Sequence, residues 1–229
     1  MHFGAGSPSA TGISVSTSGA PAVLIEAGST GRLADADLAA EDGPGIVVRA
    51  GAAPLLEGNR IETAGQAGLL YDGSSGRAVG NTITGAAASG IEVRGKSAPD
   101  LSGNRIEGAG QAGLFVHGGG RGQYQGNTIV GSRFSGIVVG AGAAPVLISN
   151  TVLDGAEHGI LVLEGGTAAL QGNRIEGNAG YGIAVAIGAE IERDGDVLAG
   201  NREPQIRTDV RVEPPAAAPD PLDEAAATE

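Results

Sequence analysis

The segment GIEVRGKSAPDLSGNRIEGAGQA, Gly90 to Ala112, decides the fold, because close variants precede and follow it at a spacing of 22 or 23 residues. It opens with a glycine and an alternating apolar pair, Ile91 and Val93. A turn of small residues and proline follows, then Leu101, a Gly-Asn pair and Ile106. Repetition at this period indicates a solenoid, in which each repeat is one structural unit stacked on the next.

Eight rows of sequence align when the chain is written at this period. Six of the seven steps between rows are 23 residues and one is 22. The rows open at Ala22, Gly45, Gly68, Gly90, Gly113, Gly136, Gly159 and Gly182. The second position of each row is apolar, and so is the fourth: Val23, Ile46, Leu69, Ile91, Leu114, Ile137, Ile160 and Ile183, then Ile25, Val48, Tyr71, Val93, Val116, Val139, Val162 and Val185. Two later columns are mostly apolar: Leu33, Leu56, Val79, Leu101, Tyr124, Leu147, Leu170 and Arg193, then Leu38, Ile61, Ile83, Ile106, Ile129, Val152, Ile175 and Leu198.

Each row predicts three short strands, since alternating β-branched residues bounded by Gly, Pro and Asn are typical of strands. Leucine-rich repeats have a similar period, but they need a Leu-x-x-Leu-x-Leu core and a helical return. The return segments here are AGAAP or GKSAP. Calcium-binding nonapeptide repeats need a recurring Gly-Gly-x-Gly-x-Asp motif, which does not recur here. The prediction is an all-β, single-stranded right-handed parallel β-helix of about eight coils, three strands per coil.

A column of asparagines supports this fold. It comprises Asn59, Asn81, Asn104, Asn127, Asn150 and Asn173, with Asp196 in the same position of the last row. Asparagine tolerates the left-handed backbone of a tight turn, and stacked amides can bond one another and the neighbouring backbone. We therefore expect a structural Asn ladder rather than a set of catalytic residues.

The GIxV…GNxI pattern, from about Ala22 to Asn201, resembles the right-handed parallel β-helix repeats of the pectate-lyase-like superfamily, especially the type found in carbohydrate-binding proteins and sugar hydrolases (CASH). That resemblance implies the fold. It leaves the activity open, because the superfamily includes lyases, hydrolases, epimerases, phage spikes and non-enzymatic interaction modules. In its sugar-active members, the resemblance implies a site on the outer face of the first strand, walled by long insertions. This chain has almost none, which favours a non-enzymatic role.

Composition and charge exclude several classes of partner. Glycine supplies 42 of 229 residues and aromatics only 3%, which suits many tight turns around small aliphatic side chains. The net charge of −12 disfavours nucleic acid. No apolar run is long enough to span a bilayer, and the start, MHFGAGSPSATG, lacks the pattern of a signal peptide. With no cysteine to indicate a compartment, we expect a soluble protein, cytoplasmic by default.

Four segments are predicted along the chain. Ile13 and Val15 fall where the last strand of a partial preceding coil would lie, and Ile206 and Thr208 fall on the first-strand columns of a closing turn. The end of the chain holds five acids, four prolines and no base. The segments are an N-terminal cap (1–21), the β-helix (22–204), a C-terminal capping strand (205–212) and a disordered acidic tail (213–229).

The third position of each row should point to solvent, yet it is apolar in every row except one. It reads Leu24, Val47, Leu70, Glu92, Phe115, Val138, Leu161 and Ala184. A continuous exposed apolar column is typical of a partner surface. We therefore predict that Leu24, Val47, Leu70, Phe115, Val138 and Leu161 bind a protein partner or a second copy of the chain. The alternative is that the N-terminal segment or the tail covers this column.

The fifth position alternates acid and base: Glu26, Arg49, Asp72, Arg94 and His117. Such alternation suits a cross-strand ladder of ion pairs on a solvated face. The alternative is a catalytic cluster of Asp72, Glu92, Arg94 and His117, in which two carboxylates act as acid and base and Arg94 binds a uronate carboxylate. That second function would be a carbohydrate-binding or polysaccharide-active domain, for instance a lyase or hydrolase.

The third strand carries paired charges, Arg60/Glu62, Arg105/Glu107 and Arg174/Glu176, interpreted as a surface ladder. Metal and cofactor sites are not expected. The three histidines, at positions 2, 117 and 158, lie several coils apart. The run from Gly118 to Gly120 is interpreted as a turn, because no helix follows it to make a phosphate loop.

Overall fold

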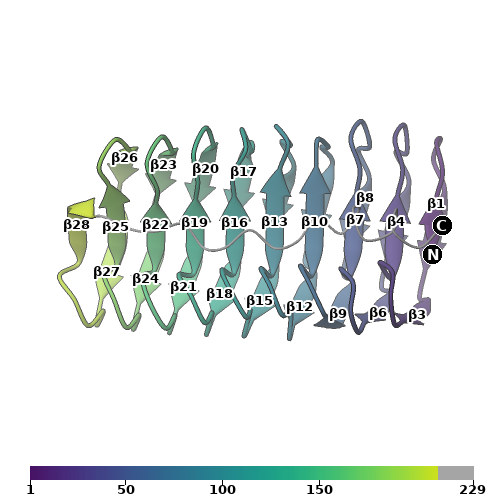
Figure 1. Cartoon of the computed structure of the whole chain (residues 1–229), viewed down its shortest axis with the longest axis horizontal. Coiled ribbons are helices and arrows are strands. Elements are labelled where there is room, and N and C mark those ends of the chain that lie inside the picture. Colours follow the sequence, from purple (N-terminus) through teal and green to yellow (C-terminus); the bar gives the residue numbers. More distant parts are fainter. Residues whose placement is uncertain (211–229) are drawn as a thin grey trace.

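The computed structural model describes residues 1–210, which wind into a parallel β-helix of about nine coils built from three sheets (Figure 1). Every pairing between neighbouring strands is parallel. No helix long and apolar enough to cross a membrane occurs in this part of the chain. The prediction of an all-β parallel solenoid with three strands per coil is confirmed.

Each coil contributes one strand to each sheet, and the first sheet has one strand more than the others. The first sheet contains β1 (His2–Phe3), β4 (Val23–Ile25), β7 (Ile46–Val48), β10 (Leu69–Asp72), β13 (Ile91–Arg94), β16 (Leu114–Val116), β19 (Ile137–Val139), β22 (Ile160–Val162), β25 (Ile183–Ala186) and β28 (Ile206–Val210). The second contains β2 (Ser9–Thr11), β5 (Arg32–Ala34), β8 (Leu55–Glu57), β11 (Arg77–Val79), β14 (Asp100–Ser102), β17 (Arg121–Gln125), β20 (Ala144–Ile148), β23 (Thr167–Gln171) and β26 (Glu190–Asp194). The third contains β3 (Ser14–Thr17), β6 (Asp37–Ala40), β9 (Arg60–Ala64), β12 (Thr82–Thr84), β15 (Arg105–Glu107), β18 (Thr128–Val130), β21 (Thr151–Leu153), β24 (Arg174–Glu176) and β27 (Val197–Ala199).

The strand register matches the sequence rows at almost every position. Ile137 pairs with Ile160, and Ile160 with Ile183, so like side chains lie directly above one another. One assignment was wrong: the buried residue of β11 is Ala78, and Val79 points outward. The 22-residue row is one residue short before β11, which shifts this strand by one position.

The coil count is nine rather than eight, because residues 1–21 supply one strand to each sheet. These strands lack paired aliphatics; β3 is Ser-Val-Ser-Thr, for example. At the other end, Ile206 and Thr208 pair with Ile183 and Val185, as expected of a closing strand. The acidic tail predicted for 213–229 lies outside the described residues.

The core is a column of aliphatic side chains with two tyrosines inside it. Tyr71 and Tyr124 are both fully buried, and burial raises the pKa of both phenols. The Tyr124 hydroxyl donates to the Arg121 carbonyl at 2.7 Å. The Tyr71 hydroxyl has no hydrogen-bond partner among the described residues. The two tyrosines therefore contribute differently to stability.

We expect Tyr71→Phe to be neutral or to stabilise the protein by up to about 1 kcal/mol, since it removes an unsatisfied buried hydroxyl. Tyr124→Phe removes a made hydrogen bond and leaves the Arg121 carbonyl without it, so it should cost about 1–2 kcal/mol. Urea denaturation of the two variants provides the comparison. A larger loss in Tyr71→Phe than in Tyr124→Phe would contradict this account.

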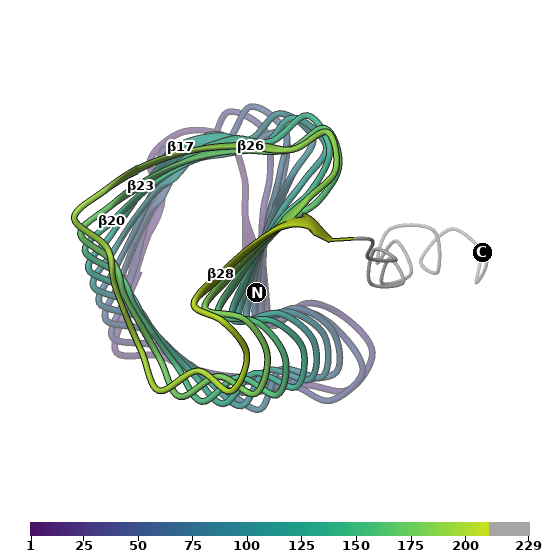
Figure 2. The same ribbon diagram turned by 90° about the vertical axis from the view of Figure 1, so that its left-hand side faces the viewer.

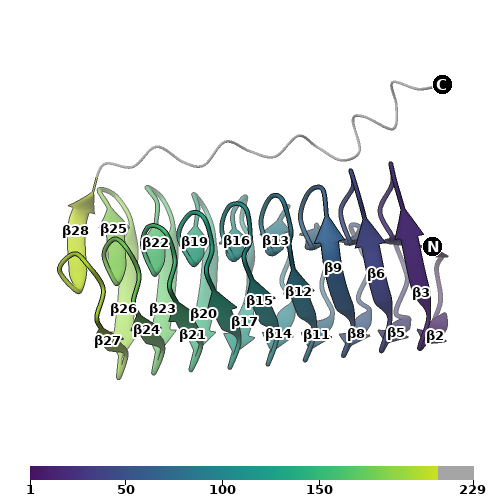
Figure 3. The same ribbon diagram turned by 90° about the horizontal axis from the view of Figure 1, so that it is seen from below.

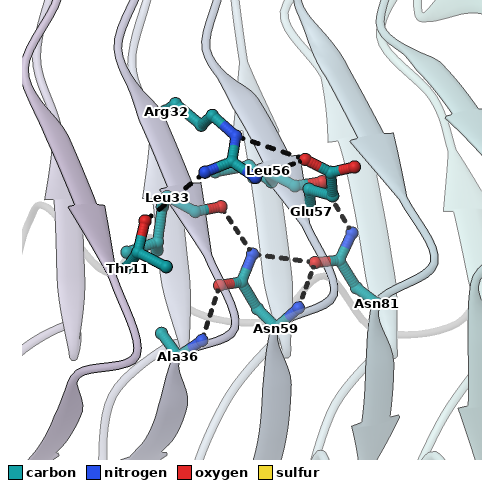
Figure 4. A network of polar contacts seen from close by, with 8 residues as sticks. All are labelled: Thr11, Arg32, Leu33, Ala36, Leu56, Glu57, Asn59 and Asn81. Carbon is teal, nitrogen blue, oxygen red and sulfur yellow. Dashed lines mark hydrogen bonds and ion pairs between the residues drawn. The ribbon is translucent and has the colours of Figure 1, made fainter.

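The Asn ladder forms as predicted and links the second and third sheets in the seven coils from Asn59 to Asp196; Figure 4 shows its first two members, Asn59 and Asn81. Asn59 Nδ2 donates to the Leu33 carbonyl at 3.0 Å and to Asn81 Oδ1 at 2.9 Å. Asn59 Oδ1 accepts the Ala36 backbone N–H at 3.1 Å. Asp196 ends the ladder. Its Oδ1 accepts the backbone N–H and the side-chain Nδ2–H of Asn173, each at 2.8 Å. Each side chain thus satisfies buried backbone groups at a sharp bend.

The cross-section is not round. Figure 2 shows that the first sheet is set inward, and that the bends leading into it and out of it project on either side. We call the outward side of the first sheet, between these bends, the concave face. The bend before each first-sheet strand is the entry bend, and the bend after it is the exit bend.

Candidate functional site

The apolar column predicted as an interface lies on the concave face, but most of it is not exposed. Val47, Leu70, Val138 and Leu161 are at most 2% exposed, and only Leu24 and Phe115 are partly exposed. The expectation that this column faces water is therefore wrong for four of its six residues. A protein interface through these four would need the bends to open.

The covering residues come from the entry bends. Ala67 packs with Val47 and Leu70, and in later coils Phe134 and Tyr181 pack with Val138, Leu161 and their neighbours. These clusters make two small cores outside the main one. No residue of the N-terminal segment belongs to either cluster, and the tail lies outside the described residues. In the sequence, this cover is marked by a small or aromatic residue that recurs just before the opening glycine of a row.

The four residues of the predicted cluster, Asp72, Glu92, Arg94 and His117, do come together on the concave face. Arg94 Nη2 lies 3.1 Å from Asp72 Oδ2, and its Nη1 lies 3.7 Å from Glu92 Oε1. His117 Nε2 lies 3.0 Å from Glu92 Oε1. Because an ionised carboxylate only accepts, the histidine donates through Nε2. We call these four residues the charged cluster.

Adjacent strands hold the cluster rigidly. Asp72 and Arg94 are register partners on β10 and β13, and Glu92 is register partner of Phe115 on β16. The Phe115 ring stacks on the His117 ring, with centroids 4.3 Å apart and planes 18° from parallel. Glu92 is only 7% exposed, and its buried carboxylate is paired with Arg94 and His117. The cluster presents polar edges beside one flat aromatic platform.

A second set of charges continues the cluster toward the N-terminus. Glu26 pairs with Arg49 at 3.5 Å and with His2 at 3.0 Å, so the predicted ladder of alternating charge is present. Glu26, Arg49 and Asp72 line an open hollow of about 360 Å³ together with Ala27 and Ala50. The polar half of the concave face therefore spans the first six coils, from His2 to His117.

This arrangement suits binding better than acid–base catalysis. Both carboxylates of the cluster are already paired with Arg94, so neither points unpaired toward a ligand. Arg94 is in turn occupied by two carboxylates, so a uronate carboxylate would have to displace them. No group of side chains in residues 1–210 has the composition of a metal site. The side chains of the cluster can form hydrogen bonds with the hydroxyl groups of a ligand, and no proton has to be transferred for this.

His158, on an entry bend, has a pKa that its surroundings lower. His158 Nδ1 accepts the Tyr181 backbone N–H at 3.1 Å, and the two rings stack with centroids 5.2 Å apart. Burial lowers the pKa of His158, and the nearby Glu203 carboxylate partly offsets this. The ring is therefore neutral in the folded protein at neutral pH.

The free energy of unfolding is expected to fall as the pH drops below about 6.5. In that range the unfolded chain binds a proton at His158 that the folded chain resists, so protonation favours unfolding. Urea denaturation between pH 7.5 and 5.5 measures the effect, and the same series in His158→Gln is the control. Burial raises the pKa of neighbouring Glu157, whose effect has the opposite sign. Equal pH dependence in the variant and the parent protein would contradict this role of His158.

Comparison with known proteins identifies the fold. A family model described as the right handed beta helix region matches residues 3–149 and 67–207. Curated protein sequences yield no match. Among solved structures, a mutant of the periplasmic alginate epimerase AlgG superposes with a TM-score of 0.71 at 18% identity, covering 76% of this chain and 46% of that one.

Two further structures superpose over similar lengths. The enzymatically active domain of tailspike protein 2 from bacteriophage CBA120 gives a TM-score of 0.62 at 14% identity, covering 80% of this chain and 33% of that one. The A-module of a mannuronan C-5 epimerase from Azotobacter vinelandii gives 0.56 at 19% identity, covering 84% of this chain and 63% of that one. The chain thus spans less than two thirds of each of these proteins.

Proposed function

The chain belongs to the right handed beta helix family, and from that premise we propose that its concave face binds a polysaccharide without cleaving it. The observation that carries the proposal is the charged cluster. It places two carboxylates, one guanidinium and a stacked aromatic pair on one face of a long rod. Carboxylate and guanidinium groups bond sugar hydroxyls, and a flat ring packs against the apolar face of a pyranose.

The proposed ligand is a neutral polysaccharide. Counted with neutral histidines, the polar half of the concave face carries three acids, Glu26, Asp72 and Glu92, and two bases, Arg49 and Arg94. Opposite charges are paired within it. A polyanion would meet no excess positive charge here, and the whole chain carries a net charge of −12. A polymer of neutral sugars is not repelled by this negative charge.

The structural neighbours support a carbohydrate ligand. The three superposed proteins are named as an alginate epimerase, a mannuronan epimerase and the enzymatically active domain of a phage tailspike. Two of these names specify a polysaccharide. The absence of long insertions in the bends argues for binding rather than turnover, because a catalytic cleft needs walls that exclude water.

Binding to immobilised neutral and uronate-containing polysaccharides tests the proposal. We expect Asp72→Ala with His117→Ala to weaken binding of a neutral polymer at least about tenfold, since each lost charge-assisted hydrogen bond is worth about 1.5–3 kcal/mol. Arg77→Ala, on the second sheet away from the concave face, is the matched control and should bind normally. Unchanged binding in the double variant would remove the cluster from the proposal. Release of shortened or unsaturated product would show an enzyme instead.

A further inference from the structure

The outward face of the third sheet carries a regular pattern of charge. This face is separate from the concave face and plays no part in the proposed function. Figure 3 shows the strands of this sheet side by side along the rod. The middle residue of each three-residue strand points inward and is buried, and the residues before and after it point outward. The face is therefore two side chains wide and nine strands long.

Three arginines and three glutamates occupy opposite edges of this face, and Asp37 of β6 is an acid on the arginine edge. Arginines stand at the leading outward position of three strands, Arg60 on β9, Arg105 on β15 and Arg174 on β24. Glutamates stand at the trailing outward position of the same strands: Glu62, Glu107 and Glu176. Between them lie uncharged rows, Thr82/Thr84, Thr128/Val130 and Thr151/Leu153.

These side chains are available at the surface. The arginines are between half and three fifths exposed, at 59%, 51% and 59%. Arg174 Nη2 lies 2.5 Å from Glu176 Oε2, Arg105 pairs with Glu107 in the same way, and Arg60 lies 3.5 Å from Asp37 Oδ1. Exposed pairs of this kind contribute little to stability. Their arrangement in two columns of opposite sign therefore calls for another explanation.

We propose that a second copy of the chain docks on this face, with the two rods side by side and related by a two-fold axis parallel to the rod. Such an axis keeps each coil at its own height and reverses the strand direction. The leading residue of every row then faces the trailing residue of the same row in the other copy. Arg105 would face Glu107 of the other copy, and Arg174 would face Glu176.

The spacing of the charged rows fixes one alignment. Rows β9 and β15 are two strands apart in the sheet, and rows β15 and β24 are three apart. A shift by one coil would set most of the charged side chains against threonine, valine, leucine or alanine, and would set Glu62 against the acid Asp37. An axis perpendicular to the rod would set arginine columns against each other. Only the parallel axis pairs each of the three Arg/Glu rows with its opposite charge in the other copy.

The size of the face predicts a weak dimer. Nine strands at about 4.8 Å make a face about 40 Å long, and two outward residues make it about 11 Å wide, so each copy buries about 400–500 Å². A stable complex buries about 800 Å² per partner. We therefore expect association that depends on protein concentration and weakens with salt.

Sedimentation velocity over a range of protein concentrations tests the proposal, because it measures the size of the species in solution. It is applied to the parent protein and to two charge-reversed variants of the full chain. One carries Arg60→Glu, Arg105→Glu and Arg174→Glu, and the other carries Glu62→Arg, Glu107→Arg and Glu176→Arg. Each alone should sediment as a 22.3 kDa monomer, whereas an equimolar mixture should form a 1:1 dimer. The parent protein should dimerise at high concentration. Three reversals on the second sheet, Arg32→Glu, Arg77→Glu and Arg121→Glu, are the matched control and should leave dimerisation unchanged.

A cross-linking experiment covers the case in which a charge-reversed variant fails to fold. The chain has no cysteine, so Thr82→Cys introduces one thiol on the proposed interface and Ser102→Cys introduces one on the second sheet. A short bis-maleimide should join two copies through the first thiol and not through the second. A monomeric parent protein at its highest soluble concentration, a mixture without dimer, or equal cross-linking at both positions would overturn the proposal.

Discussion

Replacing Asn104 by alanine is expected to lower the free energy of unfolding by about 3–5 kcal/mol, one of the two largest effects in this protein. The Asn104 side chain makes four buried hydrogen bonds. Its Oδ1 accepts the backbone and side-chain N–H groups of Asn81 at 3.0 and 2.9 Å. Its Nδ2 donates to the Ala78 carbonyl and to Asn127 Oδ1, each at 2.9 Å. The loss is large because each of these buried groups loses a hydrogen bond, and the Asn81 backbone N–H loses the one it donates to Asn104 Oδ1.

The reciprocal substitutions Asn104→Asp and Asp196→Asn provide the control. Aspartate inside the ladder lacks the donor and places a charge beside Asn127 Oδ1, so Asn104→Asp should cost as much as alanine. Asp196 ends the ladder, and Asp196→Asn loses only the contact of its Oδ2 with Arg193 at 3.2 Å. We expect it to cost under about 1 kcal/mol. Urea denaturation measures all three, and a loss below about 1 kcal/mol in Asn104→Ala would contradict the ladder's structural role.

Gly136→Ala is expected to destabilise the protein by about 3 kcal/mol or more, the upper range for overpacking. A Cβ atom at this position would clash with the Val152 Cγ1 methyl and would lie 2.9 Å from the Gly159 carbonyl oxygen. The carbonyl belongs to the next coil and cannot move without disturbing the first sheet. Gly19→Ala, where a Cβ meets no atom within 4 Å, is the control and should be close to neutral.

The second coil suggests a compensating substitution. Its row opens with the buried Ala22 instead of glycine, and the matching residue of its third sheet is Leu38 instead of a β-branched one. In most later rows the clash involves a methyl on the Cβ of isoleucine or valine. Gly136→Ala combined with Val152→Leu should therefore regain part of the lost stability in the same urea measurement. A double variant no more stable than Gly136→Ala would contradict this explanation.

The sequence was sufficient to predict the coils, because each strand pairs with a residue 22 or 23 positions away and the repeat makes that pairing visible. Ile91 and Leu114 illustrate this, since they are adjacent in the sheet and in the aligned rows. The charged cluster was predicted for the same reason. All four of its residues lie in the third and fifth columns of three consecutive rows, and both columns point outward.

The burial of the outward column could not be derived from strand alternation. Alternation assigns Val138 and Leu161 to the outside of the sheet, which is correct, but outside does not mean exposed here. The entry bends fold over the concave face and bring Phe134 and Tyr181 onto these residues. That fold-back depends on the path of a bend of variable sequence, which the period does not constrain. The shifted strand at Ala78 was missed because the place of a one-residue deletion within a row is ambiguous.

The uniform pairing of each coil with its two neighbours has a kinetic consequence. All pairings close loops of similar, modest length, so no single distant contact must form before the others. Any adjacent coils that form can act as a nucleus, and the rest can add in either direction like a zipper. Unfolding by the same route should begin at the terminal coils, which have a neighbour on one side only, and proceed inward.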